Sequence, residues 1–503
     1  MKKKFVLQAD YQASNTDPEL FSNEEAALEW MFHDIDNKGA QVDTILWETH
    51  PFIEMEVEEE NFAAYKGLKA RGCDLMNMVI DECHKRGIEA IMHYRISEVD
   101  HSHLYGTNGK PTKDDKSLWN PVKLAHPDWV VKTWWVQGHW NLAARGVREM
   151  KLEYIERMLK KYRFDGICVD FSRHTPCFPV GKEWENRESG TELMAGIRSI
   201  TESLGRPMRV GAKVPKCEQF CITDGFDVKE WAKRGLVDFF VVGSRSITVD
   251  VAWYKEITRG SGIEIYPCWD CHHSTDAYHC YPADFFRGMI GNWFALGADG
   301  AVGFNFSPTL EHNEVMSRWT EWLVHPFLEF REYFSEAEDE SLAHTYVAER
   351  RGGYPYRSGK FTSNDDCQLP AVLANDGTPT IVSVEAYGNH SGRAQLSVTI
   401  SGAKRGIDEF EVYLNGEKRA LSKVNFDYVD PQIFYPAPQP ASSGLRHRYE
   451  TATPTKLLHL VCEVDAASIR NGVNTVSVAV IDRTNYFLED ISVEKAEITV
   501  FNA

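Results

Sequence analysis

The sequence has 503 residues and a formal net charge of −19, with 43% hydrophobic and 26% charged residues. A chain of this length exceeds one ordinary core, so we expect two domains, one of them large. The acidic balance argues against nucleic acid as a partner, because phosphate groups require a basic surface, and equally against an anionic membrane surface.

The beginning of the chain and the cysteine content bear on the cellular compartment. Three lysines are followed by only three apolar residues, Phe5, Val6 and Leu7, a run too short for a signal peptide. No later apolar run is long enough to span a bilayer. The eleven cysteines are odd in number and widely scattered, which is typical of reduced thiols. We therefore expect a cytoplasmic protein, with export by a route that the sequence does not reveal as the alternative.

Eight short apolar runs alternate with helix-like stretches over the first part of the chain. The runs cover residues 4–9, 44–47, 89–93, 167–169, 209–212, 238–242, 264–268 and 301–304. Between them, apolar residues recur at helical spacing, as in residues 75–83, where Gly87 closes the helix. Strands that alternate with helices in this number predict an α/β fold of the (β/α)8 TIM barrel class.

A long excursion interrupts the alternation between the third and fourth strands, at about residues 96–144. It contains the segments HPDW (126–129) and QGHWNLA (137–143) and five tryptophans: Trp119, Trp129, Trp134, Trp135 and Trp140. Loops of this length in a compact domain are usually functional or disordered. The tryptophans favour a packed, functional excursion.

The pattern changes after Pro308. A helix with Trp319 and Trp322 leads to a segment rich in Gly, Tyr and Pro at about residues 350–370. Short alternating runs follow at 380–384, 395–400, 410–414, 457–464, 474–481 and 491–500, with Asn-Gly turn pairs at 415–416 and 471–472. This predicts a C-terminal β-sandwich domain over residues 341–503, after a barrel over residues 1–340. The sequence leaves three alternative roles for the sandwich: covering the flank of the barrel, forming a homodimer interface, or binding glycan.

Charged residues stand directly behind the predicted barrel strands, at the end where such barrels carry their chemistry. The carboxylates are Asp10, Glu48, Asp170 and Asp270, and the cations are Arg95, Arg173, Lys213 and Arg245. In an acidic protein, this group of cations indicates an anionic ligand held by its carboxylate, phosphate or sulfate. Ion pairing between the cations and their neighbouring carboxylates is the alternative. Paired carboxylates also suit acid–base catalysis at a glycosidic bond.

The segment Cys268-Trp269-Asp270-Cys271-His272 has the spacing of a covalent haem site and part of that of a zinc site. Haem attachment requires export, which nothing in the sequence directs. Zinc binding through Cys268, Cys271, His272 or His273, and Cys280 lacks the second cysteine pair of a structural site. The sequence has no phosphate-cradling glycine loop and no G-x-S-x-G motif. We therefore expect neither a metal nor a cofactor.

Several motifs within roughly residues 1–310 resemble segments of known glycosidases. They are HPDW, NLA, VRE and KY-x-FDGI-x-VD-x-x-R, and the last of these includes Asp170 and ends at Arg173. The sandwich that follows the barrel is a further shared feature. In these features the chain resembles the glycosyl-hydrolase-like family 10 group, and it looks closest to the inverting sialidases of glycoside hydrolase family 156. The resemblance implies an exo-acting hydrolase that releases terminal sialic acid, with sialylated glycans or other anionic saccharides as partners.

The resemblance also implies residue roles. Asp10 would be the base that activates water and His139 the acid, with His93 or His126 as alternatives for the acid, and Asp170 would complete the catalytic group. Substrate contacts would come from Arg95, Arg173, Arg245, Lys213, Asn305, Asp270, Trp47, Trp134 and Trp140. An activated water suits a sialoside, because its own carboxylate would repel a carboxylate nucleophile. A glycosidase for another anionic sugar, such as a uronic acid, and a non-catalytic carbohydrate-binding barrel are the alternative functions.

Overall fold

The computed structural model describes residues 2–9, 23–36, 42–49, 68, 70–97, 120–133, 137–243, 246–270, 278, 282–306, 336–339, 341–350, 367–430, 432–433, 456–483 and 490–501. For residues 30, 33–36, 270, 305 and 306 it describes the backbone alone.

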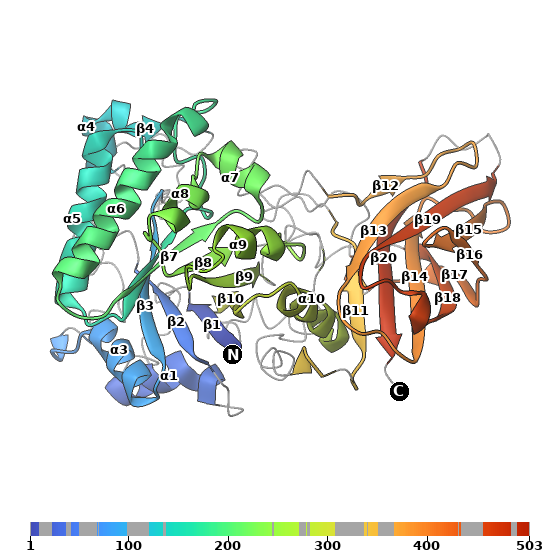
Figure 1. Cartoon of the computed structure of the whole chain (residues 1–503), viewed down its shortest axis with the longest axis horizontal. Helices are drawn as coiled ribbons and strands as arrows, with labels where there is room; N and C mark the ends of the chain where they lie inside the picture. The colour runs from blue at the N-terminus through green and yellow to red at the C-terminus, as the bar shows by residue number, and fades with distance from the viewer. Residues whose placement is uncertain are drawn as a thin grey trace.

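Eight parallel strands form a closed barrel, drawn from blue to yellow-green in Figure 1. In chain order they are β1 (Lys4–Ala9), β2 (Thr44–Glu48), β3 (Glu89–Arg95), β6 (Gly166–Asp170), β7 (Arg209–Val214), β8 (Phe239–Val242), β9 (Glu264–Asp270) and β10 (Gly300–Phe306). Each strand coincides with one of the eight expected apolar runs. The (β/α)8 prediction is therefore confirmed.

The described helices lie on the outside of the barrel (Figure 1). They are α1 (Glu24–Asp36), α3 (Leu75–Lys85), α4 (Pro121–Ala125), α5 (Arg145–Lys161), α6 (Arg187–Ser203), α7 (Glu218–Asp224), α8 (Val228–Lys233), α9 (Val251–Ile257) and α10 (Ala283–Ala295). Helix α3 shows why they form. The Asp74 carboxylate caps its first turn by accepting from the backbone N–H groups of Met76 and Asn77, and Gly87 follows its end at a positive φ of 70°.

The barrel interior follows the two-residue period of its strands. Its apolar layer consists of Val6, Leu46, Ile91, Cys168, Phe239, Val241, Tyr266, Cys268, Val302 and Phe304. Because alternate side chains of a strand point the same way, the residues two positions after this layer also face inward. Near the C-terminal ends of the strands these residues are polar: Gln8, Glu48, His93 and Asp170. The two-residue period of the strands thus places polar and charged side chains at the C-terminal end of the barrel, next to the apolar layer of its interior.

The second unit is a β-sandwich, drawn in orange and red in Figure 1. One sheet has the order β11-β20-β14-β18-β17, with β12 paired to β20, and the other has the order β13-β19-β15-β16. Their apolar inner faces share one core. The strands are β11 (His344–Val347), β12 (Ala371–Val372), β13 (Thr380–Ala386), β14 (Arg393–Ser401), β15 (Glu409–Leu414), β16 (Glu417–Arg419), β17 (Lys423–Tyr428), β18 (Leu457–Asp465), β19 (Gly472–Asp482) and β20 (Ser492–Phe501). The predicted sandwich is confirmed.

Helix α10 of the barrel packs on strand β11 of the sandwich, between the two units in Figure 1. Gly288 permits this contact, because a Cβ atom at that position would lie 2.1 Å from the carbonyl oxygen of Thr345. The Arg287 side chain donates to the carbonyl oxygen of Ala343 at 2.8 Å. The expected boundary at residue 340 falls between the end of β10 and the start of β11. The expected helix with Trp319 and Trp322 lies outside the described residues.

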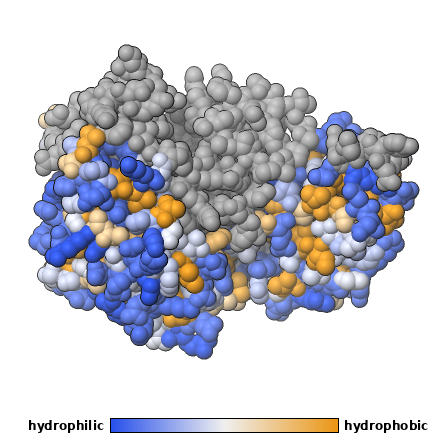
Figure 2. Space-filling view, turned by 90° about the horizontal axis from the view of Figure 1, so that it is seen from above, coloured by the Kyte–Doolittle hydropathy of each residue, from blue (hydrophilic) through white to orange (hydrophobic). Residues whose placement is uncertain are grey.

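On the face shown in Figure 2, the described surface is mainly hydrophilic, with apolar residues in small groups. On the sandwich, the exposed large apolar side chains are Val372, Ile381, Val424, Val429, Val473 and Ile481. No described helix combines the length and the hydropathy needed to cross a membrane. Within the described ranges, Cys73, Cys83, Cys168, Cys177, Cys221 and Cys462 are not in disulfides. Cys271 and Cys280 lie outside those ranges.

Candidate active site

Asp170 lies at the centre of the charged group at the C-terminal end of the barrel. The register of three adjacent parallel strands pairs Arg95 of β3 with Asp170 of β6, and Asp170 with Lys213 of β7. All three side chains are at least nine-tenths buried. Sequence reasoning singled out each of these residues, and the barrel brings them together at one level.

The two oxygens of the Asp170 carboxylate have different neighbours. Oδ1 accepts from the backbone N–H groups of Ser172 and Arg173, at 2.8 and 2.9 Å, which fixes the turn after β6. Oδ2 lies 3.3 Å from His93 Nε2 and 3.6 Å from the Lys213 ammonium. Lys213 also donates to Gln8 Oε1 at 2.8 Å. Asp170 therefore both shapes a loop and holds a cation.

Burial and charge act in opposite directions on Asp170. Burial alone would raise the pKa of this carboxyl, but Lys213, His93 and Arg95 together hold it well below its usual range. Burial also lowers the pKa of His93, and the attraction of Asp170 offsets only part of that effect. At neutral pH the site therefore contains an ionised Asp170 beside a neutral His93.

Glu48, Arg173 and His174 extend this group. Glu48 Oε2 lies 2.7 Å from an Arg95 guanidinium nitrogen, so Arg95 forms an ion pair at the end of strand β2. Burial lowers the pKa of His174, and the charges of Arg173 and Arg95 lower it further. His174 is buried and directly follows Arg173 in the turn after β6. His174 is thus a member of the site that the predicted residue set omitted.

His139 reaches this end of the barrel on a short hairpin. Strands β4 (Val130–Val131) and β5 (His139–Trp140) pair antiparallel, so that Val131 lies opposite His139. Backbone hydrogen bonds from Leu142 to Cys177 and from Asn141 to Trp129 fix the segment after the hairpin. His139 is fully buried, and its Nδ1 lies 3.3 Å from the Thr133 hydroxyl. Burial and the nearby charge of Lys123 lower the pKa of His139 to about 3.

Several buried polar atoms at this end have no hydrogen-bond partner within the described part of the chain. They are Gln8 Nε2, both ring nitrogens of His93, His139 Nε2, Asp170 Oδ2, Ser172 Oγ and Thr175 Oγ1. Buried polar groups in folded proteins are normally hydrogen-bonded, and leaving one unsatisfied costs about 1–3 kcal/mol. Their concentration on one face is typical of a site that binds a polar molecule.

Two tryptophans predicted to line a sugar pocket, Trp47 and Trp140, are buried. Trp47 is 1% exposed and points away from the barrel axis, with its indole N–H donating to Cys83 Sγ of α3 and its ring against Phe32 of α1. It belongs to the layer between strands and helices, because Leu46 before it takes the inward position. The Trp140 ring is 2% exposed, with the ammonium groups of Lys123 and Lys151 at 4.8 and 5.1 Å from its centroid. The predicted pocket-lining role of Trp47 is therefore wrong, whereas that of Trp140 stays a prediction.

His126 was an alternative for the acid. It is exposed and stacks on the Trp129 ring, with centroids 4.0 Å apart. That ring fills the space beside Gly146 of helix α5, where a Cβ atom would lie 2.1 Å from it. The HPDW segment is therefore a packing element that connects the excursion to α5.

Other predicted positions lie outside the described residues. Asp10, Trp134 and Arg245 are among them, as are Cys271, His272, His273 and Cys280 of the zinc alternative. For Asp270 and Asn305 the backbone belongs to β9 and β10, but the side chains are not described. Within the described ranges, no group of three or more His, Cys, Asp or Glu side chains is arranged to hold a metal ion.

The sequence matches no known protein family and no curated protein. Among solved structures, it is similar to α-L-fucosidase isoenzyme 2 from Paenibacillus thiaminolyticus, with 13% identity and a TM-score of 0.41 over 69% of this chain and 51% of that chain. It is also similar to catalytic domain 2 of an Ostrinia furnacalis Group II chitinase, with 11% identity and a TM-score of 0.35 over 67% and 96% of the two chains.

A third similar structure is an α-galactosidase from Geobacillus stearothermophilus, with 9% identity and a TM-score of 0.35 over 99% of this chain and 55% of that chain. By their names these proteins are glycosidases. The chain spans about half the length of the fucosidase and of the galactosidase. At these identities and TM-scores the similarity carries no argument about activity, which has to be argued from the barrel end itself.

Proposed function

We propose that the chain is a glycoside hydrolase that removes a terminal anionic sugar from a glycan, and that this sugar is sialic acid. The observation that carries the proposal is the group of charged and incompletely hydrogen-bonded side chains at the C-terminal end of the barrel. This end of the (β/α)8 fold is where its enzymes carry their active sites.

The charge of the described group supports an anionic substrate. Arg95, Arg173 and Lys213 supply three positive charges, Glu48 and Asp170 supply two negative ones, and His93 and His139 are neutral. Three cations gathered at one end of the barrel are notable in a protein whose formal net charge is −19. A substrate carboxylate suits such a group, because guanidinium groups donate two parallel hydrogen bonds to it.

The proposed reaction is hydrolysis with inversion. Asp10, which remains the predicted base, would remove a proton from a water molecule that attacks the anomeric carbon. His139 would donate a proton to the leaving glycosidic oxygen. An attacking water keeps the Asp10 carboxylate away from direct contact with the substrate carboxylate. Because the pKa of His139 is about 3 in the ligand-free protein, the substrate carboxylate has to raise it for the proton to be available.

The decisive experiment compares an aryl sialoside with an aryl glucuronide, with the anomeric product followed by NMR. Asp10→Ala and His139→Ala are measured beside the unchanged protein. We expect cleavage of the sialoside with inversion and a loss of activity of about 10²–10⁴ in each variant. His126→Ala is the matched control, since His126 is exposed and stacked on Trp129, and we expect it to retain activity.

The other outcomes separate the alternatives. If the protein cleaves only the glucuronide, the site accepts an anionic sugar other than sialic acid. Retention of configuration would contradict the activated-water mechanism, because retention requires an enzyme nucleophile. If neither substrate reacts and a glycan array shows binding, the barrel is a carbohydrate-binding module and the hydrolase proposal fails.

A further inference from the structure

The sandwich contacts the barrel at the same end that carries the candidate active site. Ala348 and Glu349, just after β11, make these contacts, and we call residues 348–350, which include the neighbouring Arg350, the bracing segment. The Glu349 carboxylate accepts from the Lys216 ammonium at 2.8 Å, and the carbonyl oxygen of Ala348 accepts from the Tyr278 hydroxyl at 2.8 Å. Lys216 follows strand β7 and Tyr278 follows strand β9, so both contacts reach loops that leave the C-terminal end of the barrel.

The bracing segment is itself firmly held within the sandwich. The Ala348 N–H donates to the carbonyl oxygen of Ala496 on β20 at 3.0 Å. Arg350 is fully buried and pairs with Glu494, also on β20, at 2.7 Å. A buried ion pair of this kind fixes its geometry, since either charge alone would be costly in the interior. The loops of the barrel are therefore attached to a rigid strand.

Lys216 is a junction between two loops and the sandwich. Its carbonyl oxygen accepts from the N–H of Asp250, which caps helix α9 after strand β8, at 3.0 Å. The preceding carbonyl, that of Pro215, accepts from the Tyr254 hydroxyl at 2.8 Å. The Lys216 and Glu349 side chains are both more than nine-tenths buried. Three residues before Lys216 on the same chain is Lys213, which contacts Asp170.

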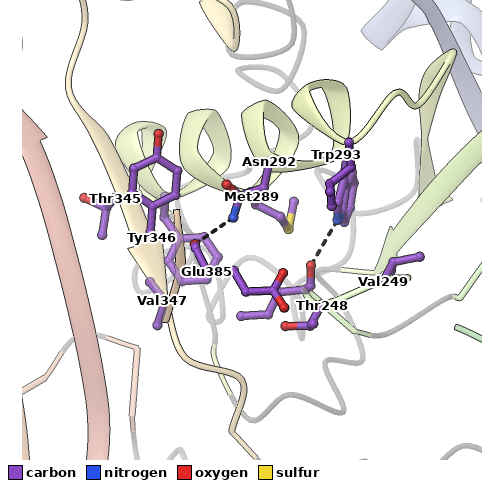
Figure 3. A pocket seen from close by; sticks show the side chains of 12 residues that line it. Thr248, Val249, Met289, Asn292, Trp293, Thr345, Tyr346, Val347 and Glu385 are labelled. Carbon is purple, nitrogen blue, oxygen red and sulfur yellow. Dashed lines mark hydrogen bonds between the residues drawn. The ribbon is translucent and has the colours of Figure 1, made fainter. Parts of the chain in front are cut away.

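The loop after β8 lies beside the sandwich at a small pocket between the two units (Figure 3). Thr248 and Val249 line it from the barrel side, with Trp293 of α10, while Tyr346 and Glu385 line it from the sandwich. The Glu385 side chain extends toward Thr248 in Figure 3. Burial raises the pKa of Glu385, and Glu349 and Asp250 raise it further while Lys216 opposes them. Charged groups of both units thus face one another beside the bracing segment.

We propose that the bracing segment positions the loop after β7, through it the described residues 246–250 after β8, and Tyr278 after β9, and that the Glu349–Lys216 pair thereby fixes Lys213 for the anionic group of the substrate. The β-sandwich is then part of the support of the active site. The part of this proposal that concerns substrate rests on the proposed function, whereas the positioning of the loops does not. Lys216 and Glu349 are positioning residues, because they act through Lys213 and not on the substrate.

The test combines hydrogen exchange of the full-length protein with steady-state kinetics. In Lys216→Met, we expect the amides of Gly243 and Asp250 to exchange at least about tenfold faster, because both donate to the segment of residues 214–216. We expect KM for the aryl sialoside to rise about tenfold with kcat changed less than about threefold, since Lys213 would hold the substrate anion in ground and transition states alike. Lys216→Arg keeps the charge and should restore both quantities.

Two further variants keep the test decisive. Lys216→Met with Glu349→Gln removes both charges, so that folding is not compromised by an unpaired buried carboxylate. Arg198→Met is the matched control, because Arg198 pairs with Asp238 at 2.9 Å at the opposite end of the barrel. We expect this control to leave the Gly243 and Asp250 amides and KM unchanged.

The outcomes for positioning and for function are separable. Faster exchange at Gly243 and Asp250 without turnover of any sialoside supports positioning and contradicts the proposed activity. Turnover with unchanged exchange and unchanged KM in Lys216→Met contradicts positioning and leaves the activity standing. Equal effects of Lys216→Met and Arg198→Met on exchange throughout the barrel would reduce the bracing segment to general structural support and overturn the proposal.

Discussion

Strand β7 carries a cation near each end of the barrel, the partly buried Arg209 at its start and the buried Lys213 close to its finish. Arg209 contacts Glu89 at 2.9 Å, pairs with Glu264 and donates to the Tyr266 hydroxyl at 3.3 Å. Lys213 donates to Gln8 and lies 3.6 Å from an Asp170 oxygen that has no hydrogen bond within the described residues. Strand β7 therefore carries one cation with several hydrogen-bonded partners, Arg209, and one cation beside a carboxylate oxygen that lacks a hydrogen bond within the described residues, Lys213.

The same contrast holds for the neighbours of each cation. At the N-terminal end, Thr44 donates to Glu89 at 2.7 Å and Lys4 lies 3.1 Å from Glu264, so the carboxylates there are hydrogen-bonded. At the C-terminal end, His93, Asp170 and His139 all have buried polar atoms without such a partner in the described ranges. The carboxylates at the two ends of this barrel therefore differ in how completely they are hydrogen-bonded.

The largest effect on activity is expected from a substitution of Asp170 at the C-terminal end of the barrel. In Asp170→Asn, the amide oxygen still accepts the backbone N–H groups of the turn, but Lys213 loses its negative partner. We expect kcat/KM for the aryl sialoside to fall by about 10³, as for the loss of a major electrostatic contact. Unfolding by denaturant should show a loss of about 3–5 kcal/mol, since a buried charge is left unpaired. Unchanged kcat/KM would show that this end is structural.

A pH profile tests the second group at that end, His139. If a protonated His139 is the acid, kcat/KM should rise about tenfold per unit as pH falls from 7 toward 5, because its pKa in the free protein is about 3. His139→Gln should abolish this slope. The folded-state pKa lies below the unfolded value of 6.5, so the unfolded chain binds the proton first and stability declines as pH falls from about 6.5 toward 3.

The measurement therefore requires a thermal unfolding curve at each pH, so that rates are taken only where the protein is folded. A slope that persists in His139→Gln would assign the acid role to another group, with His93 as the next candidate.

Breaking the N-terminal end should change stability and leave activity intact. Arg209→Met leaves Glu89 and Glu264 without their shared cation, and we expect a loss of about 3–5 kcal/mol in the free energy of unfolding. The kcat/KM of the folded fraction should stay within about twofold of that of the unchanged protein, because neither carboxylate faces the candidate site. A loss of kcat/KM comparable to that of Asp170→Asn would remove the distinction between the two ends.

The smallest expected effect sharpens the comparison. Gln8→Leu removes the hydrogen bond that Lys213 donates at 2.8 Å but leaves Asp170 in place. We expect a loss of about 1–3 kcal/mol in stability, the cost of one unsatisfied buried donor. The KM should rise less than in Lys216→Met, because the loop after β7 keeps its attachment to the sandwich. Equal KM values for Gln8→Leu and Lys216→Met would mean that the hydrogen bond to Gln8 and the bracing segment contribute equally to the position of Lys213.

The fold was predictable because its signals are local and repeated. Each barrel strand is a short apolar run, and the register of parallel strands then brings the residues behind these runs together, as for Arg95, Asp170 and Lys213. The short strand β11 went unpredicted, since its four residues, HTYV, show no alternation. Its position depends on pairing with β20, which is distant in sequence.

The site was predictable only in part. The two-residue period of a strand would have excluded Trp47, since Leu46 before it faces inward, and would have included Gln8, which lies two positions after the inward Val6. No local signal indicates the burial of His139, because it depends on a hairpin and on contacts with the loop after β6. His174 likewise enters the site through the turn that Asp170 fixes.

The attachment of the bracing segment to β20 has a consequence for protein synthesis. The partner of Arg350, Glu494, lies 144 positions later in the chain. At a translation rate of about 5–20 residues per second, it appears about 7–30 seconds after Arg350. During that interval all eight barrel strands have already been synthesised, while the bracing segment still lacks the strand to which it pairs. The contact between the bracing segment and the barrel is therefore made without the support of β20 until late in synthesis.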